Sequence, residues 1–456
     1  MDWTPTLADR PGPTYQRIVE ALSADIAQGR LHRGQQLPTH RALAKALGVD
    51  LTTVTRAYTE ARQRGLTEAR VGQGTFVAEA GAAARPLDVA APAFDLSMNL
   101  PPQPLEADLD GRFARGIASI EREGALSAYL NYREPGGLPD ERDQAAAWLA
   151  RRLPHARGER LVICPGTQNA LFDFLTVQTA PGDVVLCETL TYPGLKTAAA
   201  LRGVRLVGVA TDAAGILPDA VDAACRAHAP KALYLVPTIH NPTAVTMPPA
   251  RRREVADVIR ANGLTLFEDD AYGALAPDVV PLATLIPERT YFAASLSKCI
   301  APGLRVSFLL TPTRDAAGAI AGALRASVQM PVSLTIALVM RWLRDGSADA
   351  IIAAIRSEAA ARQKLAAAAL AGHAYAAHPN GHHVWITLPR HWSRPEFAAH
   401  VQRQGLAVVT SEAFSIGDAP PHAIRVALGA ARSRADLVRA LDILASALKS
   451  SGTRVV

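Results

Sequence analysis

Short apolar runs that alternate with helical stretches are the feature that most restricts how this chain of 456 residues can fold. Three such runs lie at residues 183–186, 232–236 and 264–267, and stretches rich in alanine and arginine separate them. Strands that alternate with helices in this way form parallel sheets with crossover helices. The sequence therefore predicts the α/β class, with a mainly parallel sheet and helices on both of its faces.

A second feature divides the chain into two domains. Residues 78–86 are mostly small and end in a proline, which is the chemistry of a linker. A chain of this length also exceeds the size at which a single hydrophobic core stops growing. We therefore expect a small domain over residues 1–78, a linker over 79–94 and a large domain over 95–456.

Composition excludes several classes of protein. With 49% hydrophobic and 20% charged residues, the chain has the composition of a globular protein. Its four cysteines are scattered singly, so we expect reduced thiols and neither a metal site nor a disulfide framework. No stretch provides the roughly 20 apolar residues of a membrane helix, and the N-terminus lacks the pattern of a secretory signal. We therefore expect a cytoplasmic protein without a membrane partner.

The first 77 residues have the pattern of three short helices followed by a hairpin. Apolar residues with a period near 3.6 predict a first helix over about 15–29, and glycines end the second and third helices, expected over 38–48 and 51–65. Residues 66–77 form two expected strands around a glycine-rich turn. The second and third helices are spaced as in a helix-turn-helix. Such elements also occur in other folds, and the net charge of +6 alone does not indicate DNA binding.

Three segments of this region, residues 36–44, 51–58 and 72–77, together resemble the DNA-binding heads of the GntR family. The resemblance implies a winged helix-turn-helix that contacts DNA through polar side chains near the start of the third helix. It also implies a glycine in the wing that lets the backbone approach a phosphate. The candidate DNA contacts are Arg41, Thr52, Thr53, Thr55, Arg56 and Gly74.

Residues 295–305 contain a lysine in the surroundings that pyridoxal phosphate chemistry needs. Lys298 follows two hydroxyl side chains, and an arginine lies about two helical turns later. A lone lysine would be read as a surface charge, but the whole segment resembles the lysine motif of fold-type I aminotransferases. The resemblance implies that Lys298 is the catalytic residue that bonds the cofactor, and that Ser295, Ser297 and Arg305 hold its phosphate.

Acidic residues follow the apolar run at 264–267. They are expected at the carboxyl edge of the sheet, where ligands of such folds bind, although a solvated loop would have the same composition. By the same resemblance, Asp269 is the partner of the cofactor's pyridine nitrogen, and Asp270 is the runner-up for that role. Tyr272 then binds the cofactor hydroxyl.

Further segments match the aminotransferase pattern in chain order, although each alone would be an ordinary turn, a capped helix or an exposed strand residue. The candidates are Tyr132, Gly166, Thr167, Gln168, Tyr192, Asn241 and Arg425. The resemblance implies that residues 166–168 cradle the phosphate at a helix N-terminus, that Tyr192 stacks on the ring and that Asn241 bonds the cofactor hydroxyl. Arg425 is the implied partner of a substrate or effector carboxylate, and Tyr132 is expected to reach the phosphate of a neighbouring subunit.

A GntR-type head followed by an aminotransferase-like body resembles the MocR-type transcription regulators over nearly the whole chain. The resemblance implies a fold-type I body with a smaller C-terminal α/β subdomain, a homodimer and pyridoxal 5'-phosphate (PLP) as cofactor. It also implies two further partners, promoter DNA and a small amino compound as effector. We therefore expect a PLP-dependent transcription regulator whose body senses PLP or an amino compound.

Two other functions stay open on the sequence. The groups needed for transamination are all present, so a catalytically active aminotransferase with an accessory DNA-binding head fits the same residues. A DNA-binding protein that has lost its cofactor is the second alternative, and the intact lysine motif argues against it. The sequence does not identify the effector, the target genes or the direction of regulation.

Overall fold

A computed structural model describes most of the chain. The described residues are 3–6, 13–32, 34–63, 66–70, 74–77, 92–124, 126–417 and 419–450. Most of the predicted linker, the tip of the predicted hairpin and the expected end of the third helix at Gly65 lie outside these residues. Contacts group the chain into two units, Met1–Ala90 and Ala91–Val456.

The first unit contains the helices and the hairpin that its sequence predicts. Its elements are α1 (Thr14–Ala27), α2 (His40–Leu47), α3 (Leu51–Gln63), β1 (Thr67–Arg70) and β2 (Gly74–Val77). The two strands pair antiparallel. Thr39 caps α2 by accepting a hydrogen bond from the backbone N–H of Ala42, and Gly48 ends the helix with a left-handed φ of 63°.

Helix α3 is amphipathic. Val54, Ala57 and Ala61 are fully buried and share one helix face, because they are spaced by three and four residues. They pack in one cluster with Ile18 and Leu22 of α1. The other face of α3 is thereby left to solvent.

The second unit is built around a seven-stranded sheet with the order β4-β12-β11-β10-β9-β5-β6. The strands are β4 (Leu161–Cys164), β5 (Val184–Glu188), β6 (Arg205–Val209), β9 (Ala232–Leu235), β10 (Thr265–Asp270), β11 (Thr290–Ser295) and β12 (Ser307–Leu310). Strand β12 is antiparallel to both of its neighbours, and the other pairs are parallel. The prediction of a mainly parallel sheet is confirmed.

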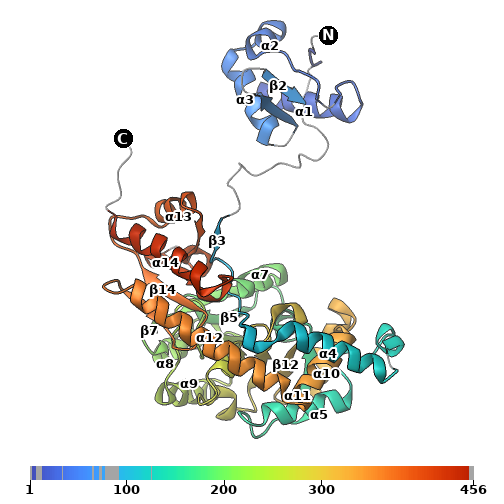
Figure 1. Ribbon diagram of the computed structural model, residues 1–456, viewed down its shortest axis with the longest axis vertical. Coiled ribbons are helices and arrows are strands. Elements are labelled where there is room, and N and C mark those ends of the chain that lie inside the picture. The colour runs from blue at the N-terminus through green and yellow to red at the C-terminus, as the bar shows by residue number, and fades with distance from the viewer. Residues whose placement is uncertain are drawn as a thin grey trace. The chain divides into compact units, whose positions relative to one another are not determined.

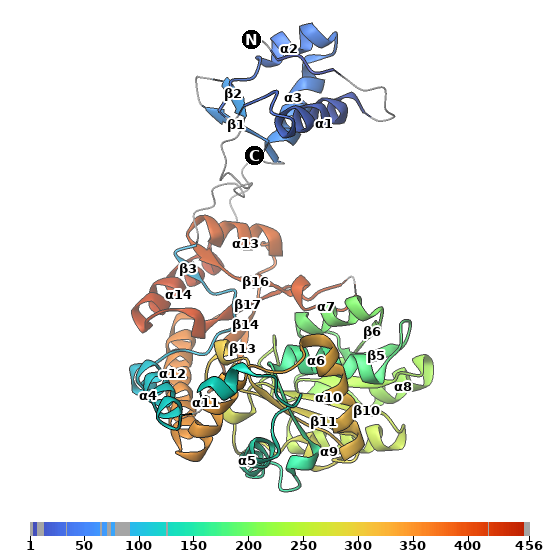
Figure 2. The same cartoon turned by 90° about the vertical axis from the view of Figure 1, so that its right-hand side faces the viewer.

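Helices cover both faces of this sheet, as expected (Figures 1 and 2). The first face carries α6 (Thr167–Gln178), α7 (Pro193–Arg202) and α10 (Arg314–Val328). The second face carries α5 (Pro139–Leu149), α8 (Pro218–His228), α9 (Pro249–Ala261), α11 (Ser333–Arg344) and the first half of α12 (Ser347–Ala369). Strand side chains alternate between the two faces, so that Tyr291 packs on the first and Phe292 on the second.

A smaller C-terminal subdomain completes the second unit. Its antiparallel sheet has the order β13-β14-β17-β16. The elements are β13 (Tyr375–Ala377), β14 (His383–Thr387), β16 (Val409–Thr410), β17 (Ala423–Ala427), α13 (Arg394–Arg403) and α14 (Arg434–Lys449). The end of α12 shares their core, and β3 (Phe94–Asp95) joins this part by parallel pairing with β15 (Leu406–Ala407).

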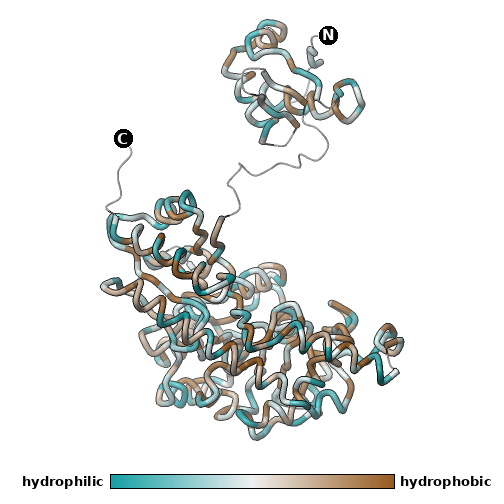
Figure 3. The backbone as a smooth tube through the Cα atoms, viewed as in Figure 1, coloured by the Kyte–Doolittle hydropathy of each residue, from teal (hydrophilic) through white to brown (hydrophobic). Residues whose placement is uncertain are grey.

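The remaining elements are α4 (Leu109–Arg122), the short pair β7 (Thr211–Asp212) and β8 (Gly215–Ile216), and several single turns of 3₁₀ helix. Hydrophobic and hydrophilic residues alternate along the helices (Figure 3), as expected for helices with one buried face. Within the described part of the chain, no helix combines the length and the apolar character needed to cross a bilayer. Nor do the described histidines, cysteines and acids form a cluster able to hold a metal ion.

Candidate functional site

A cavity of about 470 Å³ lies at the carboxyl ends of β9, β10 and β11. Its walls also include the start of α6, residues 97–100 and part of the smaller C-terminal sheet. Most of the predicted cofactor and effector residues line it, namely Thr167, Gln168, Tyr192, Asn241, Asp269, Tyr272, Ser295, Ser297, Lys298, Arg305 and Arg425. The fold therefore gathers residues that are distant in sequence into one site.

Two predicted residues do not line this cavity. Gly166 directly precedes α6 with a φ of 91°, and a Cβ atom at this position would lie 2.4 Å from the guanidinium of Arg305. Glycine therefore lets that arginine approach the start of α6. Tyr132 is 84% exposed and lies outside the cavity of its own chain, so its role toward a neighbouring subunit stays a prediction.

Lys298 is partly buried beside two other cationic side chains. Its Nζ donates a hydrogen bond of 2.5 Å to the backbone carbonyl of Asn99. Burial lowers the pKa of Lys298 to about 8, with a further contribution from the positive charges of Arg425 and Arg305. Near pH 8 a substantial fraction of this amine is neutral, which is the state in which a lysine acts as a nucleophile.

Asp269 is a buried carboxylate with one oxygen that lacks a partner. Its Oδ2 accepts a hydrogen bond of 2.7 Å from the hydroxyl of Tyr234, whereas Oδ1 has no hydrogen-bond partner among the described residues. Burial raises the pKa of Asp269 to about 6, because the charged form loses its hydration. A protonated pyridine nitrogen is a donor of the kind that this free oxygen needs. This chemistry fits PLP.

The start of α6 forms the anion-binding end of the cavity. Thr167 and Gln168 begin this helix, where free backbone N–H groups and the helix dipole favour a negative charge. The Oγ1 of Thr167 is buried and has no hydrogen-bond partner among the described residues. Arg305 is anchored beside it, since its Nη2 donates to the carbonyl of Pro165 at 3.0 Å. These groups fit a phosphate.

Arg425 forms the opposite cationic end. It projects from β17, is nearly fully buried and lies with its guanidinium carbon 4.9 Å from the ring centre of Phe414. Its Nη1 donates to Oδ1 of Asn241 at 2.9 Å, and its Nη2 donates to the carbonyl of Ser97. The described residues provide it with no acidic partner. A buried cation of this kind favours an anionic ligand group.

The sequence reasoning missed a buried hydrogen-bond network behind Lys298. The Nδ2 of Asn99 donates to the hydroxyl of Tyr272 at 2.8 Å and lies 3.0 Å from Nδ1 of His383. The Nε2 of His382 lies 2.7 Å from the carbonyl of Lys298. Two adjacent histidines before an apolar strand are the sequence signal that would have pointed to this network. Asn99 carries no comparable signal.

The structure separates the two aspartates between which the sequence left a choice. Asp269 lines the cavity, whereas Asp270 points to the other face of the sheet and forms a bidentate ion pair with Arg152. Successive strand residues face opposite sides, which accounts for the difference. The geometry therefore favours Asp269 as the partner of a ligand in this cavity.

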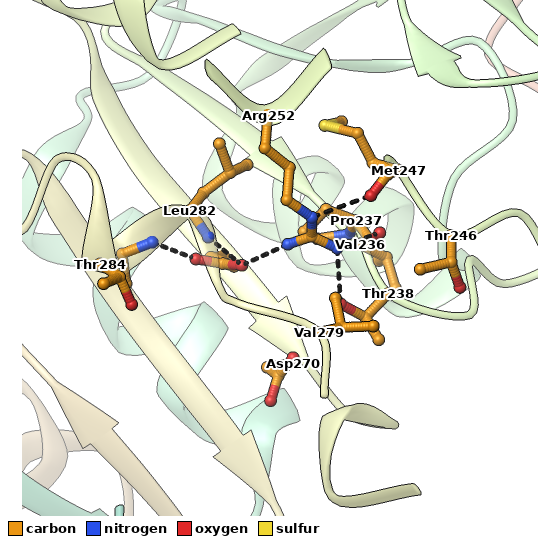
Figure 4. Close-up of polar contacts among 12 residues, drawn as sticks. Val236, Pro237, Thr238, Thr246, Met247, Arg252, Asp270, Val279, Leu282 and Thr284 are labelled. Atoms are coloured by element: carbon orange, nitrogen blue, oxygen red, sulfur yellow. Dashed lines mark hydrogen bonds and ion pairs between the residues drawn. The ribbon is translucent and has the colours of Figure 1, made fainter. Parts of the chain in front are cut away.

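Glu268 is fixed by a second set of buried contacts on that other face. Its carboxylate accepts hydrogen bonds from the backbone N–H groups of Leu282 and Ala283 at 3.0 and 2.7 Å, and it lies 3.6 Å from Nη1 of Arg252. Arg252 is held in turn by Met247, Pro237 and Thr238 (Figure 4). Burial raises the pKa of Glu268 to about 7. This network anchors the end of β10 and hence the position of Asp269.

Most of the predicted DNA contacts of the first unit are exposed. Thr52, Thr55 and Arg56 lie on the face of α3 that does not enter the core, and Arg41 of α2 and Gly74 of β2 are exposed as well. Thr53 is half-buried. The guanidinium carbon of Arg56 lies 4.0 Å from the ring centre of Tyr15. This contact holds the guanidinium of Arg56 against α1 of the same unit.

Comparison with known families matches both units. The model described as aminotransferase class I and II matches residues 94–444. The model described as bacterial regulatory proteins of the gntR family matches residues 14–77. The first match extends from β3 into α14, and the second from α1 to β2.

Individual proteins are similar over most of the chain. The uncharacterized HTH-type transcriptional regulator YdeF of Bacillus subtilis is 30% identical over 97% of this chain and 96% of its own. The vitamin B6 salvage pathway transcriptional repressor PtsJ of Salmonella typhimurium is 28% identical over 91% of this chain and 94% of its own. Among solved structures, LysN, the alpha-aminoadipate aminotransferase of Thermus thermophilus, has a TM-score of 0.71 at 26% identity. It covers 78% of this chain and 92% of its own.

Replacement of Asp269 by asparagine is predicted to stabilise the cofactor-free protein at neutral pH. The carboxyl titrates near 3.8 when unfolded and near 6 when folded, so folding stability falls as the pH rises through this window and stays lower above it. Asparagine removes this penalty, with an expected gain of about 1–3 kcal/mol at pH 8. Urea unfolding at pH 8 and pH 4 measures the difference.

The gain should shrink toward pH 4, because that pH lies at the lower end of the window between 3.8 and about 6: the folded carboxyl of Asp269 is protonated there, and the unfolded one is partly protonated. Asp257→Asn, at an exposed position of α9, is the matched control and should change stability little at either pH. A loss of stability for Asp269→Asn at pH 8 would contradict the assigned burial penalty.

Proposed function

The chain belongs to the aminotransferase class I and II family, and from that premise we propose that it is a transcription regulator that binds PLP in its second unit and promoter DNA with its first. The main support is the combination of a gntR-family match at residues 14–77 with an aminotransferase match over the rest. The names of two relatives, PtsJ and the pyridoxine biosynthesis regulator PdxR of Corynebacterium glutamicum, link those proteins to transcription and vitamin B6.

PLP is supported as the cofactor by the free oxygen of Asp269, which lacks the donor that a pyridinium nitrogen supplies. Lys298 would bond the cofactor, and Tyr192 would stack on its ring. Asn241 and Tyr272 would bind the ring hydroxyl. The phosphate would be held by Gly166, Thr167, Gln168, Ser295, Ser297 and Arg305. When bound, PLP withdraws electrons from a carbon next to an attached amino group.

An amino compound with a carboxylate is the proposed effector. Arg425 would bind the carboxylate, because its guanidinium fork matches two carboxylate oxygens and lacks an acidic partner among the described residues. The amino group would then compete with Lys298 for the cofactor. Lys298, with its pKa lowered to about 8, can accept or release a proton at cellular pH.

A homodimer in the cytoplasm completes the proposal. Leu105, Leu130 and Tyr132 of the second unit are 94%, 87% and 84% exposed, and large apolar side chains left in water favour a protein interface. A two-fold dimer would bring Tyr132 to the neighbouring subunit and would present two heads to a palindromic operator. Binding to promoter DNA would require the protein to work where the DNA is, which supports the cytoplasm as its location.

Catalytic transamination is the second candidate function, because the residues that would bind PLP and an effector are also those that a transaminase needs. The specific observation in its favour is the pair of Lys298 and Arg425 in one cavity, since a transaminase needs an amine of lowered pKa and a carboxylate partner. The two functions differ in one measurable respect. A sensor changes its affinity for DNA when the effector binds, whereas an enzyme accumulates keto acid.

The cofactor assignment predicts a visible absorption band for the purified protein that Lys298→Ala abolishes. Borohydride reduction should fix PLP covalently to Lys298, which mass spectrometry of the digested protein detects. Asp269→Asn should shift the band and weaken PLP binding, whereas Asp270→Asn, on the other face of the sheet, should change the band less. A borohydride-stable adduct at the same site in Lys298→Ala, or the reverse ranking of the aspartates, would contradict the assignment.

The DNA assignment predicts that Arg56→Ala lowers affinity for promoter DNA by about tenfold or more, since an arginine contact to a base or phosphate is worth about 1–3 kcal/mol. Binding by the wild type should also fall steeply as salt rises. Fluorescence anisotropy with the DNA upstream of the gene measures both effects. Arg62→Ala, at an exposed position in the last turn of α3, is the matched control and should bind nearly as the wild type does.

The sensor assignment predicts that an effector changes the visible band and DNA affinity over the same concentration range. A tenfold change in DNA affinity requires only about 1.4 kcal/mol of differential binding. Titration with amino acids and amines, with and without promoter DNA, tests this, and Arg425→Ala should weaken carboxylate effectors specifically. If every compound that shifts the band leaves DNA affinity unchanged while keto acid accumulates, the protein is an aminotransferase.

A further inference from the structure

A second cavity, of about 360 Å³, lies on the other face of the sheet from the cofactor cavity. Helices α5 and α12 form its outer walls, and the ends of β10 and β11 form its inner wall. Its size falls within the range of small-molecule sites. None of the motifs of the proposed function lies in it, except that Ser295 lines both cavities.

The walls of this cavity are largely apolar. Aromatic and branched side chains come from α5 and the turn after it, from β11 and from α12, namely Trp148, Leu149, Leu153, Phe292 and Ile352. Phe292, Leu149 and Ile352 belong to the buried core of this face, so the walls are fixed by packing. A ligand with an apolar body would therefore meet a preformed surface.

Charged groups are concentrated at two places in this cavity and most of them are paired. Arg152 forms its bidentate ion pair with Asp270 at the inner wall. At the rim, Asp349 accepts hydrogen bonds from Nη1 of Arg151 at 2.8 Å and from Nε1 of Trp148 at 3.3 Å. Each carboxylate thus already has an arginine partner.

Arg356 is the remaining cation of the cavity. It is half-buried on α12, and it has neither a hydrogen bond nor an ion pair within the described residues. It also borders an adjoining hollow of about 340 Å³, which His378, Asn380 and the exposed Asp278 line as well, and it forms no ion pair with Asp278. The buried Nε of Arg152 likewise lacks a hydrogen-bond partner among the described residues. A partly desolvated guanidinium that forms no ion pair among the described residues attracts an anion, and its fork fits a carboxylate.

From these contacts we infer that the second cavity binds a small organic carboxylate with an apolar body. The carboxylate pairs with Arg356, and the apolar body packs against Trp148, Phe292 and Ile352. This site is separate from Arg425 in the cofactor cavity, and its ligand needs no amino group. Binding at this site does not depend on the proposed function.

A ligand here would also act on the cofactor cavity, and this part rests on the proposed function. Asp270 of the second cavity directly follows Asp269 of the first, and Ser295 lines both. A ligand that fills the second cavity meets the wall that Asp270 and Ser295 form at the ends of β10 and β11. The visible PLP band is therefore expected to shift when this ligand binds.

The test uses 3-phenylpropionate as the probe and full-length, PLP-loaded protein, with binding measured by calorimetry. The uncharged 3-phenylpropanol is the matched probe and should bind at least about tenfold more weakly. Arg356→Gln should weaken binding of the carboxylate by about tenfold or more without affecting the alcohol to the same degree. Arg253→Gln, which replaces an exposed arginine of α9 outside both cavities, is the matched control and should bind as the wild type does.

A second variant keeps the inference falsifiable if Arg356→Gln folds poorly. Ala353 is exposed at the cavity wall, so Ala353→Trp fills the mouth without overpacking the core and should block the probe. Arg425→Ala should retain binding, because the probe does not need the cofactor cavity. Equal binding to Arg356→Gln and Ala353→Trp, loss of binding only in Arg425→Ala, or no binding by the wild type at millimolar probe would overturn the inference.

The outcomes separate this inference from the proposed function. Arg356-dependent binding in a protein that shows no PLP band would support the second site and would count against the cofactor assignment. A normal PLP band, together with probe binding that Arg356→Gln leaves unchanged, would support the cofactor assignment and would overturn the second site. Arg356-dependent binding that leaves an existing PLP band unchanged would overturn the coupling and retain the site.

Discussion

Three consecutive buried carboxylates at the end of β10 are the constraint on which the rest of the second unit depends. Strand geometry sends Glu268 and Asp270 to one face of the sheet and Asp269 to the other. Arg252 pairs with Glu268 and Arg152 with Asp270, whereas Asp269 has no arginine partner among the described residues and accepts a hydrogen bond from the hydroxyl of Tyr234. Burying a carboxylate with an unpaired oxygen costs free energy, so the folded second unit is destabilised at Asp269 until a ligand supplies a hydrogen-bond donor. The network on the second face keeps β10 in place despite this cost.

The motif residues of the site could be predicted because their chemistry is local. Lys298 is recognisable from its immediate neighbours, and Thr167 from its position at a helix start. Tyr234 and Asn99 could not be predicted, since they reach the site only through the order of the strands and the path of residues 97–100. Asn99 contributes a backbone carbonyl to Lys298, and a carbonyl leaves no trace in the choice of side chain.

The choice between Asp269 and Asp270 shows a second limit of sequence reasoning. Both residues follow the same apolar run, and a shift of one residue in a strand exchanges the two faces. Only the packing of helices on each face determines which aspartate meets the ligand cavity. The second cavity could not be predicted either, because it forms only where helices pack on the sheet. Arg356, its candidate ligand-binding residue, lies in an alanine-rich helix that has no recognisable motif. The fold class, in contrast, follows from periodicity that extends over the whole body.

The backbone just after β3, the first strand of the second unit, is attached to the two cationic side chains of the cofactor cavity. Strand β3 pairs with β15, and the residues just after it meet both cations, because Arg425 donates to the carbonyl of Ser97 and Lys298 to that of Asn99. A ligand that draws these two side chains toward itself withdraws two anchors from one short stretch of backbone. Occupancy of the cavity is thereby coupled to how firmly residues 97–99, which lie just after β3, are held.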